Sequence, residues 1–113
     1  MVAIKRVYDP AAPQDGTRVL VDGLWPRGLS RAAVACDEWR RDIAPSAALR
    51  KWYGHRPERH AEFERRYRAE LAANEGLAQL RRQAKEGPLT LLTATRDLPF
   101  SHAETLRKLL SRG

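Results

Sequence analysis

An aspartate, a tryptophan and an arginine follow an apolar run in the first quarter of the chain, where they suit contact with a ligand. The run from Val19 to Val21 ends at Asp22, and the loop after it contains Trp25 and Arg27. In open α/β sheets, ligands bind beyond the carboxyl ends of the strands. A carboxylate there can exchange a proton with a substrate, and a guanidinium can bind a phosphate through two hydrogen bonds. We therefore expect Asp22, Trp25 and Arg27 to lie at a binding site.

A second polar cluster follows the apolar run at 89–94. It contains Asp97, Ser101 and His102, and Ser101 begins a Ser-x-x-Glu capping-box pattern at the start of a helix. If the two runs are neighbouring parallel strands, both clusters lie at one sheet edge, where the positive end of the last helix favours an anion. We expect His102 to point into solvent above this cleft and to perform acid–base chemistry with Asp22. Asp97 and Ser101 are expected to bind the ligand. The alternative is a plain helix cap with an ion pair between Asp97 and an arginine.

The middle of the chain offers further polar residues around a predicted helix start. Ser46, directly after a proline, can cap a helix that carries Arg50 and ends before His55. An arginine beside aromatic residues suits a nucleic-acid base or a sugar ring, because the cation binds anions while the aromatic face stacks. We add Ser46, Arg50 and His55 to the predicted ligand-binding residues.

No pattern in the chain predicts a metal site or a bound cofactor. Cys36 is the only cysteine, and His55, His60 and His102 are too dispersed for a recognised metal-binding motif. The glycines fit neither a dinucleotide-binding nor a phosphate-loop fingerprint. We therefore expect no metal and no cofactor. A single cysteine and the lack of a signal-peptide pattern indicate a cytoplasmic location.

The elements that must position these residues are short strands and longer helices. The expected strands are Ile4 to Tyr8, Arg18 to Asp22 and Leu89 to Ala94. The expected helices cover 31–36, 46–54, a segment that starts at Pro57, a segment between Asn74 and Gly87, and a last one capped by Ser101. A long helical excursion between two buried strands indicates a parallel pair with a right-handed crossover. The predicted fold is a small Rossmann-like α/β domain, with helices flanking a mainly parallel sheet of about three to four strands.

Large apolar residues at regular spacing predict how one helix faces the core. Phe63, Tyr67 and Leu71 recur at every fourth position after Pro57, so they form one stripe on that helix. We expect this aromatic pair to pack in the core rather than to form a ligand platform.

Length and charge limit the kinds of partner. The chain has 113 residues, enough for one domain with one core, so residues 1–113 are treated as a single domain. The formal net charge of +7 favours an anionic small molecule or nucleic acid as partner, although an Arg-rich solvated surface has the same composition. No apolar segment approaches the roughly 20 residues of a membrane span. No membrane partner is expected, and nothing in the sequence indicates an oligomeric state.

Taken together, these segments resemble the domain-of-unknown-function family 488, and within it the short YeaO-like branch. The resemblance covers nearly the whole chain and is carried by 4–10, by 21–28, by Ala44-Pro45-Ser46 with Leu49, Arg50 and His55, and by Ser101-His102-Ala103. It implies a compact Rossmann-like domain and brings no established activity. The family pattern usually has arginine at the position of Gly23, so the predicted pocket is expected to lack one cation. Longer relatives carry Cys-His-Arg at the last helix start, so a thiol role there does not transfer.

Three functions fit these residues, in this order of preference. The first is a small enzyme for a phosphate-bearing substrate such as a nucleotide or nucleic acid, with Asp22 or His102 as acid or base. Arg27 and Arg50 would bind the anion. The second is a non-catalytic module that binds nucleic acid through an extended basic surface, and the third is a partner-binding adaptor. An enzyme needs a concave pocket with a carboxylate of perturbed pKa, whereas a nucleic-acid binder needs an extended basic stripe.

Overall fold

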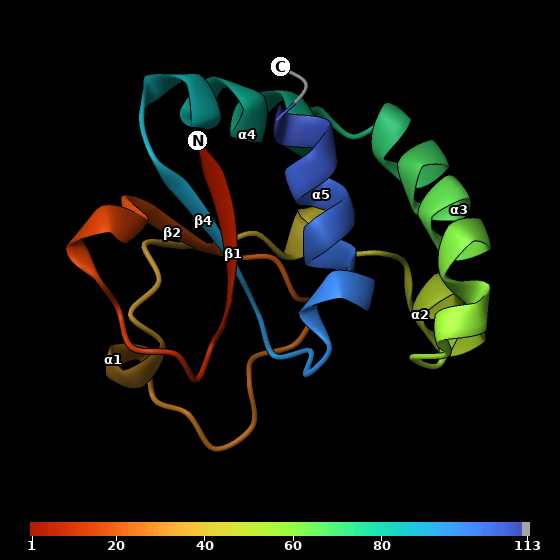
Figure 1. The fold of residues 1–113 in the computed structure, drawn as a ribbon, viewed down its shortest axis with the longest axis horizontal. Coiled ribbons are helices and arrows are strands. Elements are labelled where there is room, and N and C mark those ends of the chain that lie inside the picture. The colour runs from red at the N-terminus through yellow and green to blue at the C-terminus, as the bar shows by residue number, and fades with distance from the viewer. Residues whose placement is uncertain (112–113) are drawn as a thin grey trace.

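A four-stranded, fully parallel sheet forms the centre of the computed structural model, which describes residues 1–111 (Figure 1). The strands are β1 (Val2–Arg6), β2 (Thr17–Leu20), β3 (Glu38–Trp39) and β4 (Leu89–Thr93), in the spatial order β1-β4-β2-β3. β2 pairs in parallel with β4, as the helical excursion between them predicts. The predicted α/β fold with a mainly parallel sheet is therefore confirmed.

Five α-helices surround the sheet. They are α1 (Arg31–Val34), α2 (Ala47–Tyr53), α3 (His60–Ala72), α4 (Glu75–Glu86) and α5 (His102–Ser111), with 3₁₀ turns at Pro13–Asp15, Arg41–Ile43, Pro57–Arg59 and Leu98–Phe100. In Figure 1, α1 lies on the opposite side of the strands from α3, α4 and α5. None of the helices within residues 1–111 is long and apolar enough to cross a membrane.

Side-chain caps fix the starts of three helices, each next to a segment that the sequence predicts to be helical. Ser30 Oγ accepts a hydrogen bond from Ala33 N, and Ser46 Oγ accepts one from Leu49 N, both at 3.1 Å. Asn74 Oδ1 accepts one from the backbone of the second residue of α4. These bonds satisfy backbone donors that have no partner inside the helix, so the helices begin where the chain first offers a capping oxygen.

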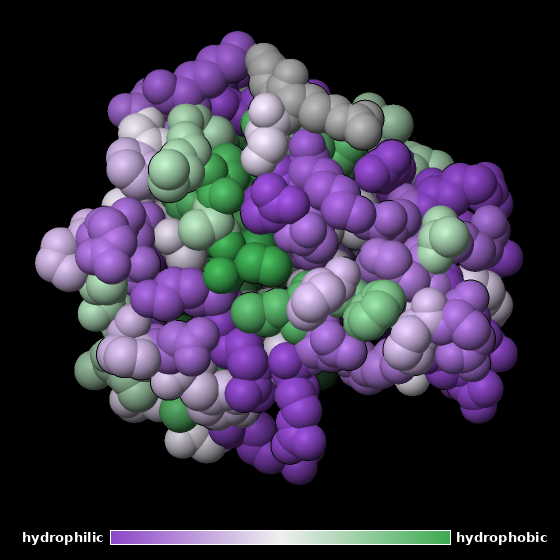
Figure 2. All heavy atoms as spheres, in the orientation of Figure 1, coloured by the Kyte–Doolittle hydropathy of each residue, from purple (hydrophilic) through white to green (hydrophobic). Residues whose placement is uncertain are grey.

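The two central strands bury both of their faces. Successive side chains of a strand point to opposite sides, so Val19 and Leu91 pack into the larger core beneath α2 to α5. Leu20 and Leu92 pack on the other face with Val34. Figure 2 shows mainly hydrophilic residues on the face that carries α5, with a narrow hydrophobic strip along β1. Burial on two sides thus explains the apolar run from Val19 to Val21 and the three leucines of β4.

The aromatic stripe of α3 is core, as its spacing predicts. Phe63, Tyr67 and Leu71 are all buried, and the Tyr67 hydroxyl donates to the carbonyl of Ile43 at 2.6 Å.

The boundaries of the first two strands differ from the predicted ones. β1 ends at Arg6 rather than at Tyr8, because Arg6 and Asp9 close a turn: Arg6 N donates to the Asp9 carboxylate, and Asp9 N donates to the Arg6 carbonyl, both at 3.0 Å. β2 ends at Leu20, two residues before the predicted end at Asp22. The two-residue strand β3 was not predicted.

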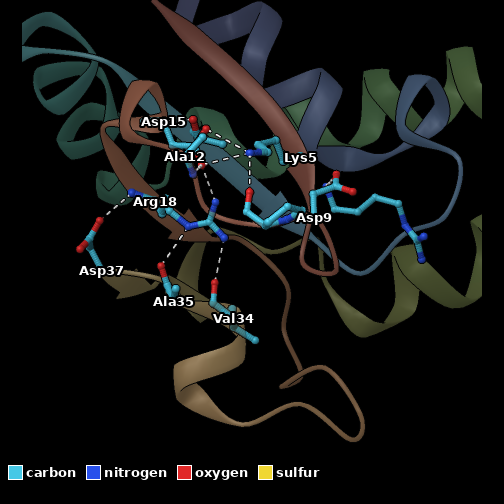
Figure 3. Close-up of polar contacts among 11 residues, drawn as sticks. Lys5, Asp9, Ala12, Asp15, Arg18, Val34, Ala35 and Asp37 are labelled. Atoms are coloured by element: carbon cyan, nitrogen blue, oxygen red, sulfur yellow. Dashed lines mark hydrogen bonds and ion pairs between the residues drawn. The ribbon is translucent and has the colours of Figure 1, made fainter.

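A buried arginine joins the start of β2 to the end of α1 (Figure 3). The Arg18 guanidinium donates to the carbonyls of Ala35 and Val34, both at 2.9 Å, and to the Asp15 carboxylate at 2.6 Å. Lys5 Nζ pairs with the same carboxylate at 3.1 Å. The carbonyls of Val34 and Ala35 and the buried charges of Asp15 and Arg18 are therefore paired with one another, as burial favours.

Gly16 allows the turn before β2 to touch the strand that follows α4. Its φ of 63° lies in the left-handed region, and a side chain at this position would collide with the backbone of Pro88. Thr17 N donates to the Pro88 carbonyl at 3.0 Å, so this close approach aligns β2 with β4.

Candidate functional site

A pocket of about 360 Å³ lies at the carboxyl edge of the sheet, where β2 and β4 end. Its walls come from the loop after β2, from α2 and the residues around it, from α3, and from the segment between β4 and α5. The predicted site residues that line it are Asp22, Trp25, Arg27, Arg50, His55, Ser101 and His102. The parallel pairing of β2 and β4 thus brings together two clusters that are far apart in the sequence.

Asp22 is held at the pocket wall by donors from β4, from the residue after it and from α5. One carboxylate oxygen accepts from Thr93 Oγ1 at 2.7 Å, and the other accepts from Ala94 N at 2.8 Å. His102 Nε2 lies 3.2 Å from the first oxygen. Burial alone would raise the pKa of Asp22, but the His102 hydrogen bond and charge, with the bonds from Ala94 and Thr93, outweigh it and lower that pKa. The carboxyl therefore stays ionised and acts as a hydrogen-bond acceptor.

His102 does not point into solvent, contrary to the prediction from sequence. Its side chain is only 11% exposed, and Nε2 lies 3.0 Å from the Val21 carbonyl as well as close to Asp22. A carbonyl oxygen can only accept, so Nε2 carries the hydrogen. The first residue of α5 is drawn inward because the strand end offers it an acceptor and a carboxylate.

Two tryptophans hold the loop that carries Arg27. Trp39 Nε1 donates to the Asp22 carbonyl at 2.8 Å, and Trp25 Nε1 donates to the Leu29 carbonyl at 2.7 Å. The two rings meet edge to face with centroids 5.3 Å apart. Trp25 thus has a structural role in addition to lining the pocket, and its N–H is already engaged.

Arg27 and Arg50 are exposed cations of the pocket wall. Within residues 1–111, arginine–carboxylate ion pairs involve other arginines, at positions 18, 40, 56, 65, 66 and 107, and not these two. Their guanidiniums therefore keep their donors available to a ligand.

His55 has a backbone that few residues of its type adopt. Its φ is 56°, in the left-handed region, directly after Gly54 at 54°. The two left-handed residues turn the chain sharply at the end of α2 and leave the exposed His55 at the pocket wall.

Two predicted binding residues lie outside the pocket lining. Ser46 caps α2, and its N–H and hydroxyl both donate to the Glu70 carboxylate of α3, at 2.9 and 2.6 Å. The anion at the start of α2 is therefore the Glu70 carboxylate of the protein itself. Asp97 is exposed, and its carbonyl closes the 3₁₀ turn by accepting from Phe100 N at 3.1 Å.

Ser101 caps α5, but only half of the predicted capping box forms. Its Oγ accepts from Glu104 N at 3.3 Å and donates to the Leu98 carbonyl at 2.7 Å. Ser101 N also donates to the Leu98 carbonyl rather than to the Glu104 carboxylate, which would complete the capping box. The Glu104 carboxylate pairs with Arg107 instead. With its hydroxyl committed and its side chain buried, Ser101 is placed as a cap rather than as a nucleophile.

Sequence reasoning missed several pocket residues because their role depends on tertiary contacts. Tyr53 is one: its hydroxyl donates to the Phe100 carbonyl at 2.7 Å and lies 3.0 Å from His60 Nδ1. Burial, with Asp97 and Glu64 nearby, raises the pKa of Tyr53. Phe63, assigned to the core from its spacing, also lines the pocket, as do Leu24, Pro26, Pro45, Ala94, Thr95 and Phe100.

The Arg50 guanidinium fills the space beside Gly23, so a cation is present there. A side chain at this position would meet Arg50, whose Nη1 would lie 2.5 Å from the new Cβ.

Within the described part of the chain, no group of His, Cys, Asp and Glu side chains is arranged to hold a metal ion.

Comparison with known proteins places the chain in a family. All of residues 1–113 match the family model described as "Inactive DUF488-N3 subclade". The chain belongs to this subclade of domain-of-unknown-function family 488. An uncharacterised protein of Mycobacterium tuberculosis (strain H37Rv) is 44% identical over 110 residues, which cover 97% of this chain and 93% of that protein. The uncharacterised protein YeaO of Escherichia coli (strain K12) is 44% identical over 106 residues, or 93% and 92% of the two chains. No solved structure matches the chain.

Proposed function

We propose that this protein is a non-catalytic binding module that holds a small phosphate-bearing ligand, such as a nucleotide, in the pocket at the carboxyl edge of its sheet. One observation carries the proposal: Arg27 and Arg50 line the same pocket as aromatic side chains, without a carboxylate partner within residues 1–111. Guanidiniums bind phosphate oxygens in pairs of hydrogen bonds, and aromatic walls suit a flat ring. The volume of about 360 Å³ falls within the usual range for small-ligand pockets.

The state of the polar residues favours binding over catalysis. Asp22 is an ionised acceptor with its oxygens occupied, so it is a poor proton donor near neutral pH. The Ser101 hydroxyl is committed to the helix start. The description of the family model as inactive supports the same choice.

A strained residue at the pocket wall adds support. His55 adopts a left-handed backbone, and strain of this kind is found more often at ligand-binding sites than elsewhere. In this proposal its imidazole supplies a further hydrogen bond to the anion.

Isothermal titration calorimetry tests the proposal with AMP, UMP, the parent nucleosides and inorganic phosphate. We expect the monophosphates to bind more tightly than the nucleosides. A charged hydrogen bond is worth about 1.5 to 3 kcal/mol, so Arg27→Ala and Arg50→Ala should each weaken monophosphate binding about tenfold or more. Arg81→Ala is the control, because Arg81 is exposed on α4, which contributes nothing to the pocket. Equal affinities for nucleosides and monophosphates would refute the proposal.

An enzyme acting on the same ligands is the second candidate, and the Asp22–His102 contact is the observation that favours it. With Nε2 held by the Val21 carbonyl and by Asp22, Nδ1 is the ring nitrogen of His102 that an enzyme could use to contact its substrate. Release of inorganic phosphate from AMP or UMP, abolished by His102→Ala, would favour the enzyme over the binding module.

A further inference from the structure

Gly23 lies in the turn between Asp22 and the pocket loop, and the end of a long side chain fills the space beside its Cα. A Cβ built on Gly23 would lie 2.5 Å from Arg50 Nη1, 3.4 Å from Arg50 Cζ and 3.6 Å from Ala44 Cβ. Only the Arg50 guanidinium therefore stands closer than ordinary van der Waals contact. The guanidinium occupies the room that any larger residue at position 23 would need.

No carboxylate within residues 1–111 holds Arg50 in its position. Arg50 comes from the last turn of α2, its side chain is long, and no ion pair within residues 1–111 fixes it. A free arginine side chain has many rotamers, and ordering it costs entropy. The space beside the bare backbone at Gly23 lets the guanidinium occupy the pocket before a ligand arrives.

We propose that Gly23 is a positioning residue for anion binding: the absence of a side chain at the Asp22–Gly23 turn lets the Arg50 guanidinium lie in the pocket. This inference rests on the proposed function. It adds that the affinity for phosphate depends on Gly23, although Gly23 has no side chain with which to contact the anion. A preorganised donor binds more tightly than one that must be ordered on binding.

A double-mutant cycle tests the inference. Gly23→Ala, Arg50→Ala and the double variant are titrated with inorganic phosphate and AMP by calorimetry. We expect Gly23→Ala to weaken binding about five- to tenfold, with no further loss when it is added to Arg50→Ala, because the alanine acts only through the guanidinium. A full additional loss in the double variant would overturn the inference.

The variant is expected to fold, because its only collision is with the far end of a flexible side chain. Gly87→Ala is the matched control: the backbone there is extended at φ 170°, and nothing lies within 4 Å of the new Cβ. Both variants should melt no lower than the wild type.

Nuclear magnetic resonance of the Arg50 Nε–Hε group without ligand separates the two proposals. We expect its chemical shift to change in Gly23→Ala and to stay constant in Gly87→Ala. An unchanged shift in Gly23→Ala overturns the inference even if the affinity falls. If the wild type binds none of the probes, the proposed function fails, and this resonance still decides whether Gly23 places Arg50.

Discussion

Asp22 accepts hydrogen bonds from Thr93, from Ala94 and from His102, so one carboxylate ties the end of β2 to the end of β4 and to the start of α5. Its type and position are visible in the sequence, because an aspartate after a buried strand lies at the ligand edge of an α/β sheet. Its donors are not visible, since they lie about seventy or more residues further along the chain. Sequence reasoning could therefore find the residue but not its protonation state.

Asp22→Asn should destabilise the protein by about 1 to 3 kcal/mol at pH 7. One carboxylate oxygen becomes an NH₂ group, which cannot accept a hydrogen bond and must face the Thr93 hydroxyl or Ala94 N. The pKa of Asp22 is lower in the folded chain than its ordinary value of 3.8. Its stabilisation is therefore complete above pH 3.8 and is lost as the pH falls through the folded value. The wild-type and variant stabilities, measured by urea unfolding, should converge in that acidic range.

Asp97→Asn makes the same chemical change on an exposed carboxylate and serves as the control. It should leave the free energy of unfolding within about 0.5 kcal/mol of the wild type. If the two variants lose the same free energy at pH 7, or if the Asp22→Asn deficit persists in acid, the interpretation of Asp22 as an ionised structural acceptor is wrong.

At the scale of elements, local chemistry predicts helix starts better than strand ends. Ser30, Ser46 and Asn74 cap helices that the sequence predicts at these places, because a cap needs only neighbours along the chain. β3 was not predicted because two residues, Glu38–Trp39, are too few to show an alternation of apolar and polar side chains. Its pairing with β2 depends on contacts that no local pattern encodes.

The start of α5 gives the element-scale prediction. Ser101→Ala should lower the free energy of unfolding by about 0.5 to 2 kcal/mol, because Glu104 N loses its capping oxygen. Glu104→Gln should cost less than about 0.5 kcal/mol, because that carboxylate pairs with Arg107 rather than with the cap. Chemical denaturation of both variants checks the order. A loss at Glu104 equal to the loss at Ser101 would mean that a complete capping box forms in solution.

In the molecule as a whole, buried apolar residues form one cluster on each face of the sheet, and the pocket lies at the carboxyl edge of β2 and β4. The double-sided burial of β2 and β4 follows from the apolar run Val19 to Val21 and from the leucines of β4, so both the sheet and the convergence of the two polar clusters could be predicted. The pocket walls could not, because Tyr53 and Phe100 join them through hydrogen bonds and packing between distant segments. Ser46 shows the opposite error: a good anion-binding pattern that Glu70 already satisfies.

The three arginines of α3 are matched by three glutamates, so this helix adds nothing to the net charge of +7. Glu62 pairs with both Arg65 and Arg66, which lower its pKa to about 2, so it stays ionised across the physiological range. Glu64 and Glu70 do not pair with the helix arginines: they bind Lys108 and Ser46 instead. Because its glutamates equal its arginines in number and Glu62 engages two of them, α3 is weaker as a nucleic-acid surface than its arginine count indicates.

Nucleic-acid binding should therefore be weak and should fall steeply with salt, because each phosphate contact releases counterions that salt opposes. An electrophoretic shift assay with duplex and single-stranded DNA at increasing salt measures this. Glu62→Gln frees two guanidiniums and should raise the affinity at low salt. Glu86→Gln makes the same charge change at an exposed residue of α4 and should have a smaller effect. A tight, salt-resistant complex of the wild type would contradict the prediction, and would make an extended nucleic-acid surface, rather than the pocket, the main binding site.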